Sequence, residues 1–100
     1  MEIRAAKESD RSALELLASE NGLKFKSSIE HTLIAEQNGK IIGYVSYTPE
    51  LKQDKWFGKH YETNALVVKE EYLGEGVVTK LIEEVTELAK SKGVNLKLRH

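Results

Sequence analysis

Hydrophobic and polar residues along this chain follow two periods, one typical of strands and one typical of helices. Residues 2–5 alternate between polar and apolar side chains, which predicts a short first strand. A helix then extends to Gly22, because Ser9 or Asp10 offers a capping oxygen and the glycine provides a stop. The apolar residues that share one face of this helix are Leu14, Leu17 and Ala18. Residues 23–30 are polar and basic and offer caps for a short helical turn.

The clearest local signal is a β-hairpin. Residues 32–36 and 40–47 are rich in strand-forming side chains, and Asn38 and Gly39 between them tolerate the positive φ angles of a tight turn. Gly43, inside the second run, indicates either a bulge or a close approach of another backbone.

The second half of the chain predicts a loop, a strand, a helix and a last strand. Residues 48–60 are polar and are interpreted as a loop, and residues 61–68 as a long strand. After a break at two glycines, apolar residues recur at helical spacing over residues 77–91, and Gly93 provides the stop. Residues 94–98 alternate as a last strand. The predicted order is therefore β-α-(α)-β-β-β-α-β in one α+β domain covering residues 1–100.

Composition and charge narrow the class of protein. Of the 100 residues, 40% are hydrophobic and 31% are charged, which is typical of a folded globular domain. Fifteen basic and sixteen acidic residues nearly cancel, so net charge gives no reason to expect a nucleic-acid partner. The absence of cysteine excludes disulfides and thiol chemistry, and His31, His60 and His100 lack metal-ligand spacing. No apolar run has the length of a signal core or a membrane span, so we expect a cytoplasmic protein with no membrane partner.

One segment resembles the cofactor-binding part of the GNAT-type (Gcn5-related) N-acetyltransferases. Residues 65–81 read ALVVKEEYLGEGVVTKL. In the family this stretch is a strand, a loop, an Arg/Gln-x-x-Gly-x-Gly/Ala turn and a helix. Residues 1–4 with Asp10 are similar to the family's usual opening, and residues 39–44 to its second hairpin strand.

The resemblance covers almost the whole chain and implies a GNAT-like (acyl-CoA N-acyltransferase) α/β sandwich. Its sheet is mixed and mostly antiparallel, with the helix over residues 77–91 packed on one face. The family continues with one more helix and two more strands.

The resemblance implies that acetyl-CoA binds at the glycine turn. Backbone N–H groups at a helix N-terminus lack intrahelical partners, and the helix dipole adds partial positive charge there. In the family this turn holds the pyrophosphate of coenzyme A, and the preceding strand bonds the pantetheine arm. The residues that the resemblance places in cofactor contact, mostly through their backbone, are Val67, Val68, Gly74, Glu75, Gly76, Val77 and Thr79.

Three positions depart from the family's pattern. Leu73 stands where Arg or Gln is usual, Val78 where Gly or Ala is usual, and Glu70 at a common proline position. The branched side chain of Val78 crowds the phosphate cradle. Glu70, Glu71 and Glu75 add negative charge beside a site for a polyanion, which opposes binding.

The activity implied by the resemblance is direct transfer of an acetyl group from acetyl-CoA to an amine of a small molecule or a protein. Glu62 lies on the strand that often carries the family's catalytic carboxylate, so it is the candidate general base; the alternative is a solvated strand residue. Asn64 occupies the other frequent acid position and cannot act as a base. His31 and His60 are alternative proton carriers, or ordinary loop and strand-end residues. Tyr44 does not align with the family's tyrosine acid and is expected to pack on the sheet.

A second interpretation stays open: a non-catalytic, truncated, decayed or engineered GNAT-like scaffold that self-associates. The last strand, residues 94–98, would then form an uncovered sheet edge, which invites pairing with a second copy. We therefore expect a homodimer through this C-terminal edge. Trp56 and Phe57 are expected either to line an acceptor pocket or to cap the edge of the core.

Overall fold

The computed structural model describes residues 1–54 and 58–97, with the side chains of residues 1–49 and 60–97. Within these residues one sheet has its strands in chain order: β1 (Glu2–Ala5), β2 (Thr32–Gln37), β3 (Lys40–Asp54), β4 (Gly58–Val68) and β5 (Asn95–Lys97). The first four strands pair antiparallel, whereas β4 and β5 are parallel. Helix α1 (Arg11–Glu20) connects β1 to β2, and α2 (Val77–Ser91) makes the crossover that parallel neighbours require. The predicted α+β order is confirmed.

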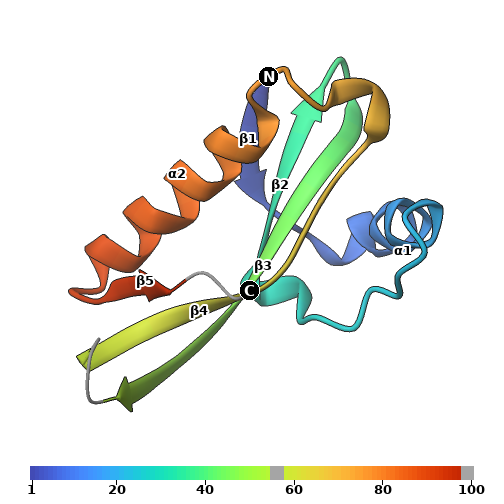
Figure 1. The fold of residues 1–100 in the computed structure, drawn as a ribbon. Coiled ribbons are helices and arrows are strands. Elements are labelled where there is room, and N and C mark those ends of the chain that lie inside the picture. Colours follow the sequence, from blue (N-terminus) through green and yellow to red (C-terminus); the bar gives the residue numbers. More distant parts are fainter. Residues whose placement is uncertain (55–57, 98–100) are drawn as a thin grey trace.

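The two helices lie on opposite faces of the sheet (Figure 1). The α2 face buries Val77, Leu81, Val85 and Ala89 of the helix against Ala35, Ile42, Val45, Tyr47, Tyr61 and Val68. The α1 face buries Leu14, Leu17 and Ala18 of the helix against Ile29, Ile34, Tyr44 and Val67. Neighbouring strand residues alternate between these two clusters, as the pleat of a sheet requires. The predicted apolar stripe of α1 is confirmed as core. The stripe of α2 is confirmed except at Val78, which was expected in the core and is 40% exposed.

The predicted hairpin is confirmed. The irregularity that the sequence indicated at Gly43 in β3 is also present. Asn38 and Gly39 have φ angles of 52° and 77°, as the tight turn requires. The register between β2 and β3 skips Ile42, which makes that residue a bulge directly before Gly43. A Cβ atom at Gly43 would lie 3.1 Å from the carbonyl oxygen of Val67. Both alternatives, bulge and close approach, therefore apply at this position.

The expectation of a loop over residues 48–60 is wrong. β3 and β4 both extend into this segment as a two-stranded ribbon that projects beyond β1 and β2 (Figure 1). Their register is irregular between Thr48 and Lys52, and Pro49, which cannot donate a ladder hydrogen bond, lies in that irregular stretch. Backbone pairing therefore continues past a proline and through a polar sequence, although both are typical of loops.

The remaining expectations concern the short turn before β2, the last strand and two aromatic residues. A short 3₁₀ turn, Ile29–His31, forms within the polar segment before β2, as predicted. The last strand begins at Asn95, one residue later than predicted, and Leu98 at its predicted end lies outside the described residues. Trp56 and Phe57 also lie outside them.

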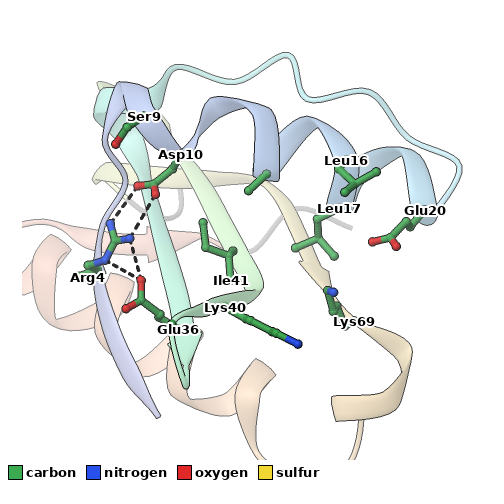
Figure 2. Close-up of a pocket in the computed structure, with 12 residues that line it drawn as sticks. Arg4, Ser9, Asp10, Leu16, Leu17, Glu20, Glu36, Lys40, Ile41 and Lys69 are labelled. Atoms are coloured by element: carbon green, nitrogen blue, oxygen red, sulfur yellow. Dashed lines mark hydrogen bonds and ion pairs between the residues drawn. The ribbon is translucent and has the colours of Figure 1, made fainter.

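A cluster of ion pairs around Arg4 joins β1, α1 and β2 (Figure 2). Its guanidinium donates to Asp10 Oδ2 over 2.9 Å and to Glu36 Oε2 over 2.8 Å. Asp10 directly precedes α1, as expected, but its carboxylate accepts from the N–H of Lys7 instead of capping α1. The hydrogen bonds from Arg4 hold the pKa of the Asp10 carboxyl below its usual range. A hollow of about 380 Å³ adjoins this cluster, and all three members of the cluster, Arg4, Asp10 and Glu36, line it.

We predict that Asp10→Asn lowers the free energy of unfolding by about 1–2 kcal/mol, because one partner of Arg4 loses its charge. A depressed pKa contributes stability that is present above the unfolded value of about 4 and is lost as the pH falls through the folded value. The difference between wild type and variant should therefore shrink below about pH 4 in urea unfolding.

The matched control is Glu8→Gln, which breaks the exposed pair of Glu8 with Arg11 and should change stability little. A difference for Asp10→Asn that stays constant into strong acid would contradict the assigned role of this carboxylate.

Candidate functional site

The edge of β4 opens beyond its midpoint. In the described residues, the last register pair of β5 with β4 is Glu62 and Lys97. Thr63 and Ala65 face consecutive residues of β3, so Asn64 is an extra residue that forms a bulge in β4. A bulge bends its strand, and in the described part of the chain β4 has no strand partner on this edge after the bulge. Among the residues that the structure describes, the second half of β4 is thus paired on one side only.

The backbone orientation along this open edge follows from one hydrogen bond. The N–H of Lys69 donates to the carbonyl of Ile42 over 2.8 Å. In an antiparallel pair alternate residues direct their N–H and C=O groups to the partner strand. Val67 therefore faces β3 with its backbone, whereas Leu66 and Val68 direct theirs to the open edge. An extended ligand that contains amides can pair with these groups as an added strand would.

An apolar hollow of about 330 Å³ adjoins this edge; its lining residues are Asn21, Leu23, Leu66, Val67, Val68, Leu73 and Val78. Four of these are large hydrophobic side chains that are between 37% and 58% exposed: Leu23, Leu66, Leu73 and Val78. Exposed apolar side chains that gather at one concave place mark a binding surface.

A second hollow, of about 640 Å³, continues from the first toward the bulge and shares Leu23 and Leu66 with it. Its other lining residues are Gly22, Lys24, Lys26, Ser27, Tyr44, Asn64 and Ala65. We call the two hollows together the β4 groove. One wall is β4 from Asn64 to Val68, and the other is the segment 21–27 that follows α1.

The glycine turn ends the groove opposite the bulge. Gly74 and Gly76 have φ angles of 87° and 81°, and Gly76 directly precedes α2. A Cβ atom at either glycine would meet nothing within 4 Å, so the backbone conformation, and not space, requires glycine there. The first N–H groups of α2 lack intrahelical acceptors and carry the positive end of the helix dipole. Leu73 and Val78 place apolar side chains beside them.

The residues predicted to contact the cofactor lie together. Val67 and Val68 line the apolar hollow, and the remaining predicted residues form the adjoining turn and first helical turn: Gly74, Glu75, Gly76, Val77 and Thr79. Val77 is 2% exposed and packs in the α2 cluster, so only its backbone can meet a ligand. Glu75 and Thr79 are exposed.

The candidate proton carriers are more dispersed. Glu62 is half-buried in β4 before the bulge and does not line either hollow of the groove. His60 is buried in β4, and the ring of His31 lies 5.6 Å from that of Tyr47. Asn64 accepts a hydrogen bond from the hydroxyl of Thr48 over 2.7 Å and lines the groove.

The sequence alone did not indicate several groove residues. Tyr44 is buried as predicted, with its ring 5.4 Å from that of Phe25, yet it also lines the groove. Burial raises the pKa of Tyr44. Asn21, Leu23, Lys24 and Lys26 come from the polar segment after α1. The signal that could have found this wall is Leu23, an apolar residue in a polar stretch.

Comparisons of the chain with known protein families and solved structures agree with these features. The sequence model of the acetyltransferase (GNAT) family matches residues 3–99, so the chain belongs to this family. No curated protein sequence matches the chain significantly.

Solved structures show the same fold. N-acetylglutamate synthase from Neisseria gonorrhoeae, complexed with coenzyme A and N-acetyl-glutamate, superposes with a TM-score of 0.80 at 20% identity over 97% of this chain. An acetyltransferase from Trypanosoma brucei gives 0.77 at 23% identity, covering 99% of this chain and 82% of that one. The ribosomal-protein-alanine N-acetyltransferase from Brucella melitensis gives 0.72 at 23% identity, covering 98% and 73%. The predicted GNAT fold is confirmed.

The chain spans only part of some of these proteins. It covers 24% of the Neisseria synthase and 63% of a Mycobacterium tuberculosis protein, Rv2747, complexed with coenzyme A. Within the described residues, neither helix is long and apolar enough to cross a membrane, and no three His, Asp or Glu side chains gather as metal ligands would.

We predict that Gly76→Ala lowers the free energy of unfolding by about 1 kcal/mol, because a Cβ atom strains the left-handed backbone. Gly76→Asn should cost less, because asparagine tolerates this conformation better. Thermal and urea unfolding measure both variants. Equal or greater stability of the alanine variant relative to the asparagine variant would contradict the left-handed geometry.

Proposed function

We propose that this chain binds acetyl-CoA along the β4 groove and transfers the acetyl group directly to an amine of a small molecule or a protein. The observation that carries the proposal is the open edge of β4, with backbone amides of Leu66 and Val68 beside an exposed apolar hollow and a helix N-terminus at one end. Membership of the acetyltransferase family supports the same conclusion.

The parts of coenzyme A match the parts of the groove. Its pyrophosphate would meet the first N–H groups of α2, where Gly74, Gly76 and Thr79 leave the approach open. The two amides of its pantetheine arm would pair with the edge of β4 at Leu66 and Val68. Its aliphatic groups would pack against Leu73 and Val78, the same side chains that depart from the family's pattern.

With the cofactor bound in this way, its thioester would lie near the bulge at Asn64. A backbone N–H aimed at the thioester oxygen would stabilise the negative charge that develops when the amine attacks. The new C–N bond forms, the C–S bond breaks, and the thiolate of coenzyme A leaves and takes up a proton.

Before attack, the acceptor must lose its ammonium proton. Glu62 is the proposed base, because it lies two residues before Asn64 on the same strand. Its neighbour Tyr61 packs in the α2 cluster, so strand alternation directs Glu62 to the α1 face, on which the groove lies. Since Glu62 does not line the groove, the proton would pass through water.

We predict that Leu73→Arg tightens acetyl-CoA binding by about three- to tenfold, because a guanidinium at the turn gains a charge-assisted bond to phosphate. Calorimetric titration measures the dissociation constant. Leu16→Arg is the matched control: Leu16 is 62% exposed against 58% for Leu73, and it lies on α1 outside the groove.

Failure of both wild type and Leu73→Arg to bind at millimolar acetyl-CoA would overturn the cofactor assignment. Binding without acetylation of any amine in a broad panel would instead favour a non-catalytic GNAT-like module.

We also propose that the C-terminal edge mediates homodimer formation. In the described residues β5 ends the sheet and pairs only with β4. An edge strand presents backbone groups that a second copy can pair with. We predict a mass of twice 11.3 kDa by light scattering coupled to size exclusion, with dissociation on dilution. A monomer at the highest attainable concentration would refute this.

A further inference from the structure

Among the described residues, the hollow at the bulge end of the β4 groove has positively charged lining side chains and no acidic ones. Its charged lining residues are Lys24 and Lys26, both from the segment after α1. The remaining lining side chains are neutral, with Ser27, Asn64 and Tyr44 as the hydrogen-bonding groups. In the part of the chain that the structure describes, neither lysine makes a salt bridge.

The hollow beside Arg4 differs in this respect. It also contains two lysines, Lys40 and Lys69, but acidic side chains share its lining: Asp10, Glu20 and Glu36 (Figure 2). The chain as a whole has a net charge of −1. The positive lining at the bulge end is therefore a local feature of the groove and not a consequence of an overall basic protein.

From this charge distribution we infer that the amine acceptor is a small molecule that carries a carboxylate or another anionic group, which Lys24 and Lys26 bind. The inference rests on the proposed acetyl transfer, because that reaction places the acceptor beside the bulge. The hollow, at about 640 Å³, falls within the usual range of small-molecule sites.

The same two lysines also favour the reactive form of the acceptor. An amine attacks the thioester only after its ammonium loses a proton. Like charges nearby disfavour the protonated form of an amine and lower its pKa. An acceptor whose anionic group is bound by Lys24 and Lys26 would thus present its amine near their positive charges, and more of that amine would be neutral.

The test compares acceptors that differ only in the anionic group. Purified full-length chain and acetyl-CoA are assayed for thiol release with a series of alkylamines of equal length, with a terminal carboxylate, an uncharged end or a second amine. Wild type should use the carboxylates with kcat/KM about tenfold above the uncharged amines. Lys24→Gln/Lys26→Gln should abolish this preference through the acceptor KM, with the KM for acetyl-CoA unchanged.

Charge-reversal variants test the same assignment by a change of preference instead of a loss. Lys24→Glu/Lys26→Glu should prefer the diamines, whereas Lys40→Glu/Lys92→Glu makes the same change in net charge outside the groove and should keep the carboxylate preference. Both lysines of the groove are exposed, and circular dichroism melting verifies that each variant folds.

The outcomes separate the two proposals. Acetylation without a carboxylate preference, or a preference that survives both groove variants, overturns the inference and leaves the acetyl transfer standing. A weakened KM for acetyl-CoA in the groove variants would assign the lysines to the cofactor and also overturn it. No acetylation of any amine by wild type removes the proposed function, and this inference with it.

Discussion

The pairing of β4 with β3, interrupted by one extra residue at Asn64, is the constraint on which the rest of the structure depends. It holds β4 from one side along both halves of the strand. The bulge bends the strand where its pairing with β5 ends, so the other side stays open within the described residues. Without the bulge, β4 would stay straight, and its second half would not bend away from the line of β5.

The two helices keep this open edge rigid. Val67 packs in the α1 cluster and Val68 in the α2 cluster, so the half-paired strand is held between two cores. Gly43 allows the start of α2 to approach β3 closely, because the position of its absent Cβ lies 3.3 Å from Val77 Cγ1. That contact sets the first turn of α2, and with it the glycine turn, at the end of the groove.

The sequence predicted those elements that are determined by the spacing or the backbone preference of neighbouring residues. Helical spacing over residues 77–91 and the Asn38–Gly39 turn each leave a periodic or conformational signature, and both elements formed as predicted. The strand extensions over residues 48–54 and 58–60 were not predicted, because their backbone pairing leaves no hydrophobic pattern in the sequence. Asp10 was expected to cap α1, yet it bonds Arg4, a partner that only the tertiary fold brings near. The groove is harder to predict from the sequence, because its two walls, segment 21–27 and β4, lie about forty residues apart in the chain. The bulge depends on the pairing register of β3 and β4, which no single residue type indicates.

The most direct test of the central claim, that the groove along the open edge of β4 is the cofactor site, is a titration of the ¹⁵N-labelled chain with acetyl-CoA followed by NMR. Amide signals of Leu66, Val68 and the first turn of α2 should shift together and saturate, while those around Arg4 and Lys40 stay in place. Shifts confined to the hollow beside Arg4, or an unchanged spectrum at millimolar ligand, would contradict the account.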